Sequence, residues 1–233
     1  MRKIFALLII QLVSYSAWSQ TMNIHYKSGQ KVQYNMENIE YVEFTEEKQS
    51  ETQVSSGEAI DLGLSVKWSS CNLGATSPEQ YGGLYAWGET STKNKYNREN
   101  YLYYDSTTES YMDIGEDISG SEYDAAHVNL GGSWRMPTYN EMKELRDRCT
   151  WEWVNVNGVN GWMVKGTNGN SIFFPTGEKN IHLWSSTIFN SNMGAKTGTA
   201  FALQFSNSHN PIGYADSGFG REQGNYIRPV MPK

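Results

Sequence analysis

Short aromatic-rich segments, cut repeatedly by Gly, Asn and Ser, make up this sequence from Ala59 onward. Few of them are long enough to form a helix, and the residues between them are those that favour turns. The chain is therefore expected to bury its aromatic side chains on short elements joined by many loops. This pattern predicts an irregular, loop-rich domain of the α+β class.

The clearest predicted helix starts after Thr138. Its hydroxyl can cap the first turn, and the carboxylate of Glu141, three residues on, can reach back to the amide of the cap residue. The face expected to be apolar carries Met142, Leu145 and Cys149. A shorter helix is predicted over 122–128, with Ser121 as its cap. Glu141, and Arg135 just before the longer helix, are accordingly assigned to structure rather than to catalysis.

Several later segments have the pattern of strands separated by Asn- and Gly-containing turns. These segments are 159–164, 171–175, 183–186, 199–205 and 226–230. We expect them to form one antiparallel sheet.

The amino-terminal segment has the layout of a secretory signal peptide. Arg2 and Lys3 precede an apolar run over 4–13, and Ala17 and Ser19 are small residues at the positions that a signal peptidase recognises. The apolar run is far shorter than the ~20 residues needed to span a bilayer. Residues 1–19 are therefore predicted to direct export to the periplasm, the cell surface or the medium, and no transmembrane span is expected.

The rest of the chain divides by composition. Residues 20–44 contain period-two runs that predict a small β leader, too short to bury a core alone. Residues 45–58 are almost entirely polar and predict a solvated linker, and residues 59–233 form the main domain. The leader is expected to pack either on the main domain or on a partner molecule.

The charge balance argues against one class of partner. The chain has a formal net charge of -6 at pH 7, and loss of Arg2 and Lys3 would make it more acidic. Nucleic-acid binding needs clustered Lys and Arg, so a nucleic-acid partner is not expected.

No cofactor, metal or catalytic site is indicated by the sequence. The histidines do not form the close pairs that zinc sites use, and no Ser-His-Asp arrangement has a local signature. Cys71 and Cys149 would be allowed to form a disulfide in an oxidising compartment. The alternative is two separate thiols that pack as small apolar groups, and both readings stay open.

Six motifs then occur in order: DLGLSVKW at 61–68, CNLGA at 71–75, YAWGE at 85–89, GGSWRMPT at 131–138, LWSS at 183–186 and IRPV at 227–230. Together they resemble the Fibrobacter succinogenes major paralogous domain family, over about residues 59–233. The resemblance implies a C-type-lectin-like fold, related to that of the formylglycine-generating sulfatase activators. It also implies that most tryptophans in these motifs are core residues, whereas Trp151, Trp153 and Trp162 are better candidates for exposure.

The chemistry of those related proteins is not expected here. The chain lacks the Glu-Pro-Asn and Gln-Pro-Asp loops that hold calcium and sugar in lectins, and no cysteine follows Cys149. The resemblance therefore implies a non-catalytic, secreted or cell-surface binding module for a glycan or protein ligand. The alternatives are a structural or assembly component of a surface complex, in which the leader strands pair with a neighbour, and an unmarked hydrolase.

Three stretches between Trp184 and Ile227 are rich in side chains that hydrogen-bond. They are either solvent-exposed loops or, as in lectin-fold proteins with variable carboxy-terminal segments, loops that cluster as one ligand face. The candidate ligand-binding residues are Phe189, Asn190, Asn192, Asn207, His209, Asn210, Tyr214 and Asp216.

Overall fold

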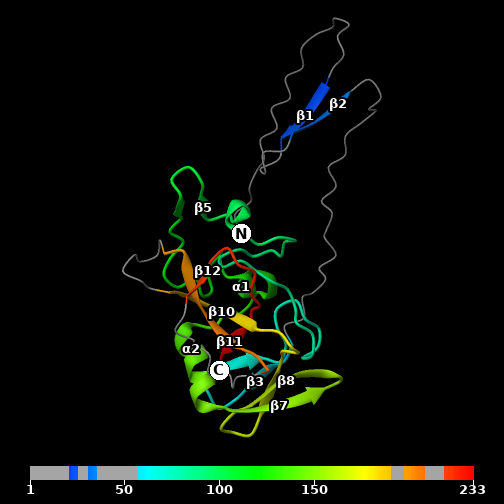
Figure 1. Cartoon of the computed structure of the whole chain (residues 1–233), viewed down its shortest axis with the longest axis vertical. Helices are drawn as coiled ribbons and strands as arrows, with labels where there is room; N and C mark the ends of the chain where they lie inside the picture. Colours follow the sequence, from blue (N-terminus) through cyan, green and yellow to red (C-terminus); the bar gives the residue numbers. More distant parts are fainter. Residues whose placement is uncertain (1–20, 26–30, 36–56, 190–196, 208–217) are drawn as a thin grey trace, which may run out of the picture. The chain divides into compact units, whose positions relative to one another are not determined.

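A computed structural model describes residues 21–25, 31–35, 57–189, 197–207 and 218–233. The chain divides into two compact units, Met1–Ser50 and Glu51–Lys233. In the first unit, β1 (Thr21–His25) pairs antiparallel with β2 (Lys31–Asn35), so the first two leader runs form a hairpin (Figure 1). The expected signal peptide and the third leader run, at 39–44, lie outside the described residues.

The second unit is closed by a sheet that joins its first strands to the end of the chain. β4 (Val66–Ser69) is the central strand, with β3 (Ala59–Asp61) on one side and β13 (Val230–Pro232) on the other. Val230 lies opposite Trp68 in this sheet. Residues more than 160 positions apart are thus paired in one ladder, which holds the two ends of the unit together.

A second sheet is a regular meander of β7 (Thr150–Val156), β8 (Val159–Lys165) and β9 (Ser171–Pro175). Asn157 and Gly158 connect β7 to β8, with φ angles of 49° and 86°. Two residues with positive φ form the turn whose twist suits an antiparallel hairpin, and Asn followed by Gly adopts it at least cost. The sequence of this turn therefore sets the register of the hairpin.

A third sheet contains β10 (Ile181–Ile188), β11 (Thr199–Phe205) and β12 (Gly218–Gly220), and a small hairpin pairs β5 (Tyr104–Asp105) with β6 (Ser110–Tyr111). The expectation of one late antiparallel sheet is wrong, because β9 does not pair with β10. Of the segment at 226–230, only Val230 belongs to a strand. Trp162 and Phe174 instead share one buried cluster with Leu183 and Phe205, so the two sheets bury their apolar faces against a common core.

The longer helix is confirmed. α2 (Tyr139–Arg148) has Thr138 as its cap, and the reciprocal bonds of Thr138 and Glu141 form a capping box. Glu141 also makes a two-point ion pair with Arg135, which supports the structural role expected for both residues.

The shorter helix differs from its prediction. α1 spans Ala125–Leu130, and its cap is Asp124 rather than Ser121. The Asp124 carboxylate accepts from the amides of Ala126 and His127 in the helix and from those of Gly120 and Met136 outside it. One buried carboxylate thus satisfies four amides, more than the hydroxyl of a serine cap can accept.

The predicted α+β, C-type-lectin-like fold class is wrong, because the described part of the chain is mainly β-sheet. Its two α-helices have only 6 and 10 residues, whereas its strands form several small antiparallel sheets. The physical reason is that only one segment combines a capped start with an apolar face long enough for a helix of more than two turns. Among the described residues, no helix has the length and apolar character to cross a membrane.

Two clusters of buried side chains form the core of the described part of the second unit. The first cluster lies between the sheets and α2 and includes Trp68, Leu145 and Phe174. The second cluster includes Trp87, Met136 and Trp184 and packs on α1. Trp68, Trp87 and Trp184 are fully buried, as expected for tryptophans within the motifs, whereas Trp134 is only partly buried.

Candidate functional site

Only two of the eight predicted ligand residues lie within the described residues. Phe189 is half-buried and packs edge-to-face on Phe201, with 5.0 Å between ring centroids, and Asn207 is exposed just after β11. The other predicted residues, Asn190, Asn192, His209, Asn210, Tyr214 and Asp216, lie outside the described residues. The single ligand face proposed for these loops stays a prediction.

Both cysteines are free thiols in the structure. Cys71 is buried beside Ser69 and Ser70, just after β4, whereas Cys149 ends α2 and packs against the first core cluster. Each side chain is thus accommodated in its own surroundings. The structure thus contains two separate thiols at these positions and no disulfide between them.

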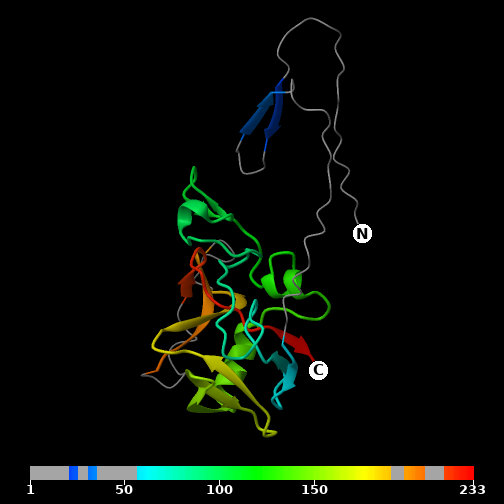
Figure 2. The same cartoon turned by 90° about the vertical axis from the view of Figure 1, so that its right-hand side faces the viewer.

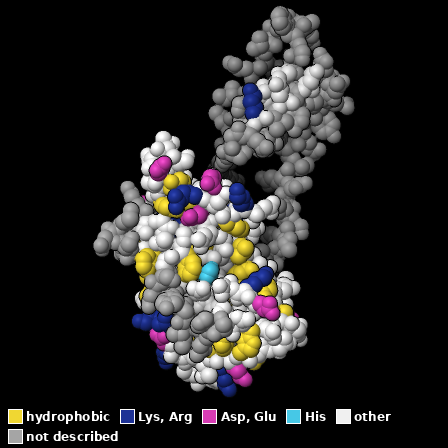
Figure 3. All heavy atoms as spheres, viewed as in Figure 1, with side chains coloured by type: hydrophobic (Ala, Val, Ile, Leu, Met, Phe, Trp, Pro, Cys, Tyr) yellow, Lys and Arg dark blue, Asp and Glu magenta, His cyan; other side chains and the backbone are white. Residues whose placement is uncertain are grey.

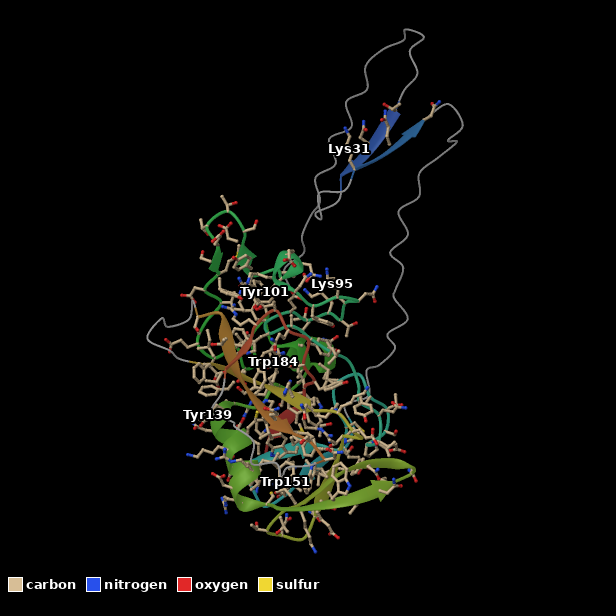
Figure 4. The ribbon with its side chains drawn as sticks, viewed as in Figure 1. Lys31, Lys95, Tyr101, Tyr139, Trp151 and Trp184 are labelled. Carbon is tan, nitrogen blue, oxygen red and sulfur yellow. The ribbon has the colours of Figure 1, made fainter. Side chains whose placement is uncertain are left out.

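A different segment of the described chain combines a pocket, paired charges and several aromatic rings at the surface. Residues 89–112, here called the tyrosine loop, contain five tyrosines among many Asn, Ser, Thr and Lys residues. The loop includes β5 and β6 and lies at the upper end of the second unit in Figure 1, where Figure 4 marks Lys95 and Tyr101. Sequence reasoning missed this loop, although its composition is the one that binding loops favour.

A pocket of about 210 Å³ opens in this loop. Its lining residues are Glu89, Thr90, Ser91, Thr92, Lys93, Asn100, Leu102 and Tyr103. Glu89 is only 4% exposed, and its carboxylate accepts from the Lys93 ammonium at 2.6 Å and from the Leu102 amide at 2.8 Å. Lys93 also donates to the carbonyl of Asn100 at 2.9 Å. Each pocket charge is therefore bonded by its neighbours.

The walls of the pocket are held by local structure. A short 3-10 helix (Arg98–Asn100) has Asn97 as its cap, and the side chains and amides of Asn97 and Asn100 bond each other reciprocally. The hydroxyl of Tyr96 donates to the carbonyl of Leu84 and accepts from the amide of Lys93. These bonds hold Lys93 and Asn100 in place in the lining of the pocket.

The buried side chain of Arg221 supports the loop from the interior of the second unit. Its guanidinium is fully buried and lies over the Trp87 ring, 4.8 Å from the centroid. It donates to the hydroxyl of Tyr101 at 3.0 Å and to the carbonyl of Met112 at 3.1 Å, while Tyr101 donates to the carbonyl of Trp87. Burial raises the pKa of Tyr101, and the nearby Arg221 only partly offsets this effect. Tyr101 is therefore a fixed neutral donor.

The outer surface of the loop combines aromatic rings with charges of both signs. Arg98 lies over the rings of Tyr104 and Tyr111, 5.2 and 5.7 Å from their centroids, and the Tyr111 hydroxyl donates to Glu222. Figure 3 shows Lys or Arg beside Asp or Glu side chains at this end of the second unit, with hydrophobic side chains between them. Leu102 is 68% exposed and Met112 is 47% exposed.

This arrangement is suited to binding. The pocket offers hydroxyls, an amide and the apolar surfaces of Leu102 and Tyr103, but no cysteine, serine or threonine in it is paired with a histidine. Within the described residues, no three His, Cys, Asp or Glu side chains are grouped so that they could hold a metal ion. Comparison with protein-family models, with curated proteins and with solved structures gives no match.

Proposed function

We propose that the chain is a non-catalytic binding module, acting after export, and that its tyrosine loop recognises a neutral, hydroxyl-rich ligand such as one sugar residue of a glycan. The observation that carries this proposal is the paired charge at the buried base of the pocket. Glu89 and Lys93 are the only charged lining residues, and they neutralise each other.

The charge pair argues for a neutral ligand. The Glu89 carboxylate would repel an anion in the pocket, and the Lys93 ammonium would repel a cation. The pocket therefore favours neither kind of ion. A neutral ligand meets no such opposition. The hydroxyls of Thr90, Ser91 and Thr92 and the amide of Asn100 then offer both donors and acceptors to ligand hydroxyls.

The size and lining of the pocket agree with one sugar ring. Pockets for drug-sized ligands have volumes of roughly 300–1,000 Å³, and the volume here is about 210 Å³. Leu102 and Tyr103 supply apolar surface on which the C–H groups of a sugar ring can rest. A small amphipathic ligand with hydroxyls at its edge matches both features.

A blocking variant tests the proposal. Ser91 is exposed and lines the pocket, so Ser91→Trp fills the pocket without removing a core contact. The control is Ser106→Trp, the same change at an exposed site in the β5–β6 connection. A glycan array identifies ligands of the unchanged chain, and titration calorimetry then compares the variants. We expect Ser91→Trp to weaken binding at least tenfold and Ser106→Trp to leave it unchanged. Equal binding by both variants would refute the pocket as the site.

A protein ligand is the second candidate, and the exposure of Leu102 and Met112 favours it. Apolar anchors surrounded by tyrosines are typical of protein interfaces. Met112 does not line the pocket, so Met112→Ser separates the two candidates. If the ligand is a protein, Met112→Ser should bind it more weakly. If the ligand is a sugar confined to the pocket, Met112→Ser should bind it as tightly as the unchanged chain does.

A further inference from the structure

The hairpin of β7 and β8 places two kinds of side chain in order on one face. Trp153 lies opposite Trp162, and the next pair on the same face, two residues along each strand, is Asn155 opposite Asn160. We call these four residues the indole–amide face. It lies at the end of the second unit away from the tyrosine loop in Figures 1 and 2, and Figure 4 marks the neighbouring Trp151 on β7.

The exposed indole of this face is held by packing. Trp153 is 37% exposed and meets the Trp162 ring edge-on, with 5.2 Å between centroids. Trp162 is only 8% exposed, and its indole N–H donates to the carbonyl of Ser206 at 3.2 Å. Trp151 packs edge-on against Trp162 from the core side. The orientation of Trp153 is therefore set before any ligand arrives.

The amide pair is also ordered. Asn155 donates to the side-chain oxygen of Asn160 at 2.7 Å and accepts from the amide of Gly158 at 3.0 Å. Both asparagines are exposed, so their further N–H groups face solvent. An exposed indole and a bonded pair of amides thus lie side by side on a regular element.

We propose that the indole–amide face is a second carbohydrate site, separate from the pocket, at which a pyranose ring in a chain stacks its C–H face on Trp153 and bonds its hydroxyls to Asn155 and Asn160. Indole rings combine a large apolar face with a rigid orientation, which suits stacking at small entropic cost. A site made of exposed residues on a regular hairpin matches an internal residue of a polysaccharide, because both neighbouring residues can extend past it.

The surroundings favour a sugar over a protein partner. Within the described part of the hairpin, Trp153 is the one large apolar side chain that is exposed. Trp162 beside it is buried, so its exposed neighbours on this face are the amides of Asn155 and Asn160. Protein hot spots instead cluster several apolar anchors inside a ring of contacts that excludes water. A single indole beside amides can cover one sugar ring, but it cannot supply such a cluster.

Affinity electrophoresis of the full chain tests this proposal, with gels that contain a soluble β-1,4-glucan, xylan, mannan or no polysaccharide. Trp153→Ala removes the stacking surface, and Trp153→Phe keeps a smaller one. The control is Glu152→Ala, because Glu152 is exposed and points to the opposite face of the same strand. Near-ultraviolet circular dichroism checks that each variant is folded.

We expect at least one polysaccharide to retard the unchanged chain. Trp153→Ala should weaken that binding about tenfold, Trp153→Phe two- to threefold, and Glu152→Ala should not change it. Ser91→Trp should bind like the unchanged chain, so failure of the pocket proposal would leave this result intact. No retardation by any of the polysaccharides, or equal retardation of Trp153→Ala and the unchanged chain, would overturn the proposal.

Discussion

At the β7–β8–β9 end of the second unit, the strands bond one another's backbone groups, and aromatic side chains fill the space behind them. At the tyrosine-loop end, the backbone is irregular, and side chains from distant positions bond its carbonyls and amides. Arg221 bonds the carbonyl of Met112, Tyr101 bonds that of Trp87, and Glu89 bonds the amide of Leu102. Regular strands satisfy one another's polar groups, whereas the buried carbonyls and amides of an irregular loop depend on a few polar side chains.

The largest effect is expected from the aromatic core of the regular end. Phe174 is fully buried between Trp151, Phe205 and Arg228. Phe174→Ala should lower the free energy of unfolding by about 4 kcal/mol, because it removes a large apolar contact and leaves a cavity. Urea denaturation measures this change, with the exposed Val128→Ala as a control near zero. A loss below about 1 kcal/mol would mean that packing does not hold this end together.

Arg221→Met should lower the free energy of unfolding by about 3 kcal/mol, because buried carbonyls lose their donors. The contrast between the two ends also predicts which backbone amides lose protection. Hydrogen exchange should accelerate over 97–112 and stay unchanged in β7 and β8. Arg148→Met, at an exposed arginine on α2, is the control. Uniform acceleration in both regions would show that the two ends are not held independently.

Glu141→Ala tests the helix that contacts the regular end. The change removes one capping-box bond and the ion pair with Arg135, for a loss of about 1–2 kcal/mol. Lys143→Ala, on the exposed face of the same helix, should cost almost nothing. Unchanged stability together with lost ligand binding would reassign Glu141 to a functional role.

The same carboxylate predicts a smaller pH effect. Burial raises the pKa of Glu141, but the bonds from Arg135 and Thr138 outweigh burial and hold it below its ordinary value of 4.5. The stability it contributes is therefore present above about pH 4.5 and is lost as the pH falls through the lower, folded-state pKa. The difference in unfolding free energy between the unchanged chain and Glu141→Gln should shrink on acidification. A constant difference down to about pH 3 would contradict this linkage.

The smallest expected effect concerns the cysteines, and it is a slow reaction of their thiols rather than a change in stability. Burial, with a contribution from Glu144, raises the pKa of Cys149 to about 11, and Cys71 is buried. Ellman's reagent at about pH 8 should therefore react slowly with the folded chain, since the thiolate is the reactive form. After denaturation without reductant, two thiols should react. No thiol in the denatured chain would show that a disulfide had formed.

Features that depend on near neighbours in the sequence were predictable. The capping box of Thr138 and Glu141 involves residues three apart, and α2 begins where this pair predicts. The strands at β8, β9 and β11 follow from short apolar segments between turn residues. The prediction of Ser121 as the cap of the shorter helix was wrong, because the actual cap, Asp124, gains two of its four amide partners from outside the helix.

The sequence by itself therefore determined the local elements and their turns, because the interactions that form them join residues a few positions apart. Only the tertiary structure decided how the strands divide into sheets, that the fold is mainly β, and that a pocket opens in the tyrosine loop. Arg221 and Tyr101, which support that pocket, are 120 positions apart, and the sequence between them gives no sign that they meet. Burial selects such partners, since a guanidinium removed from water is stable only where carbonyls, hydroxyls and rings surround it.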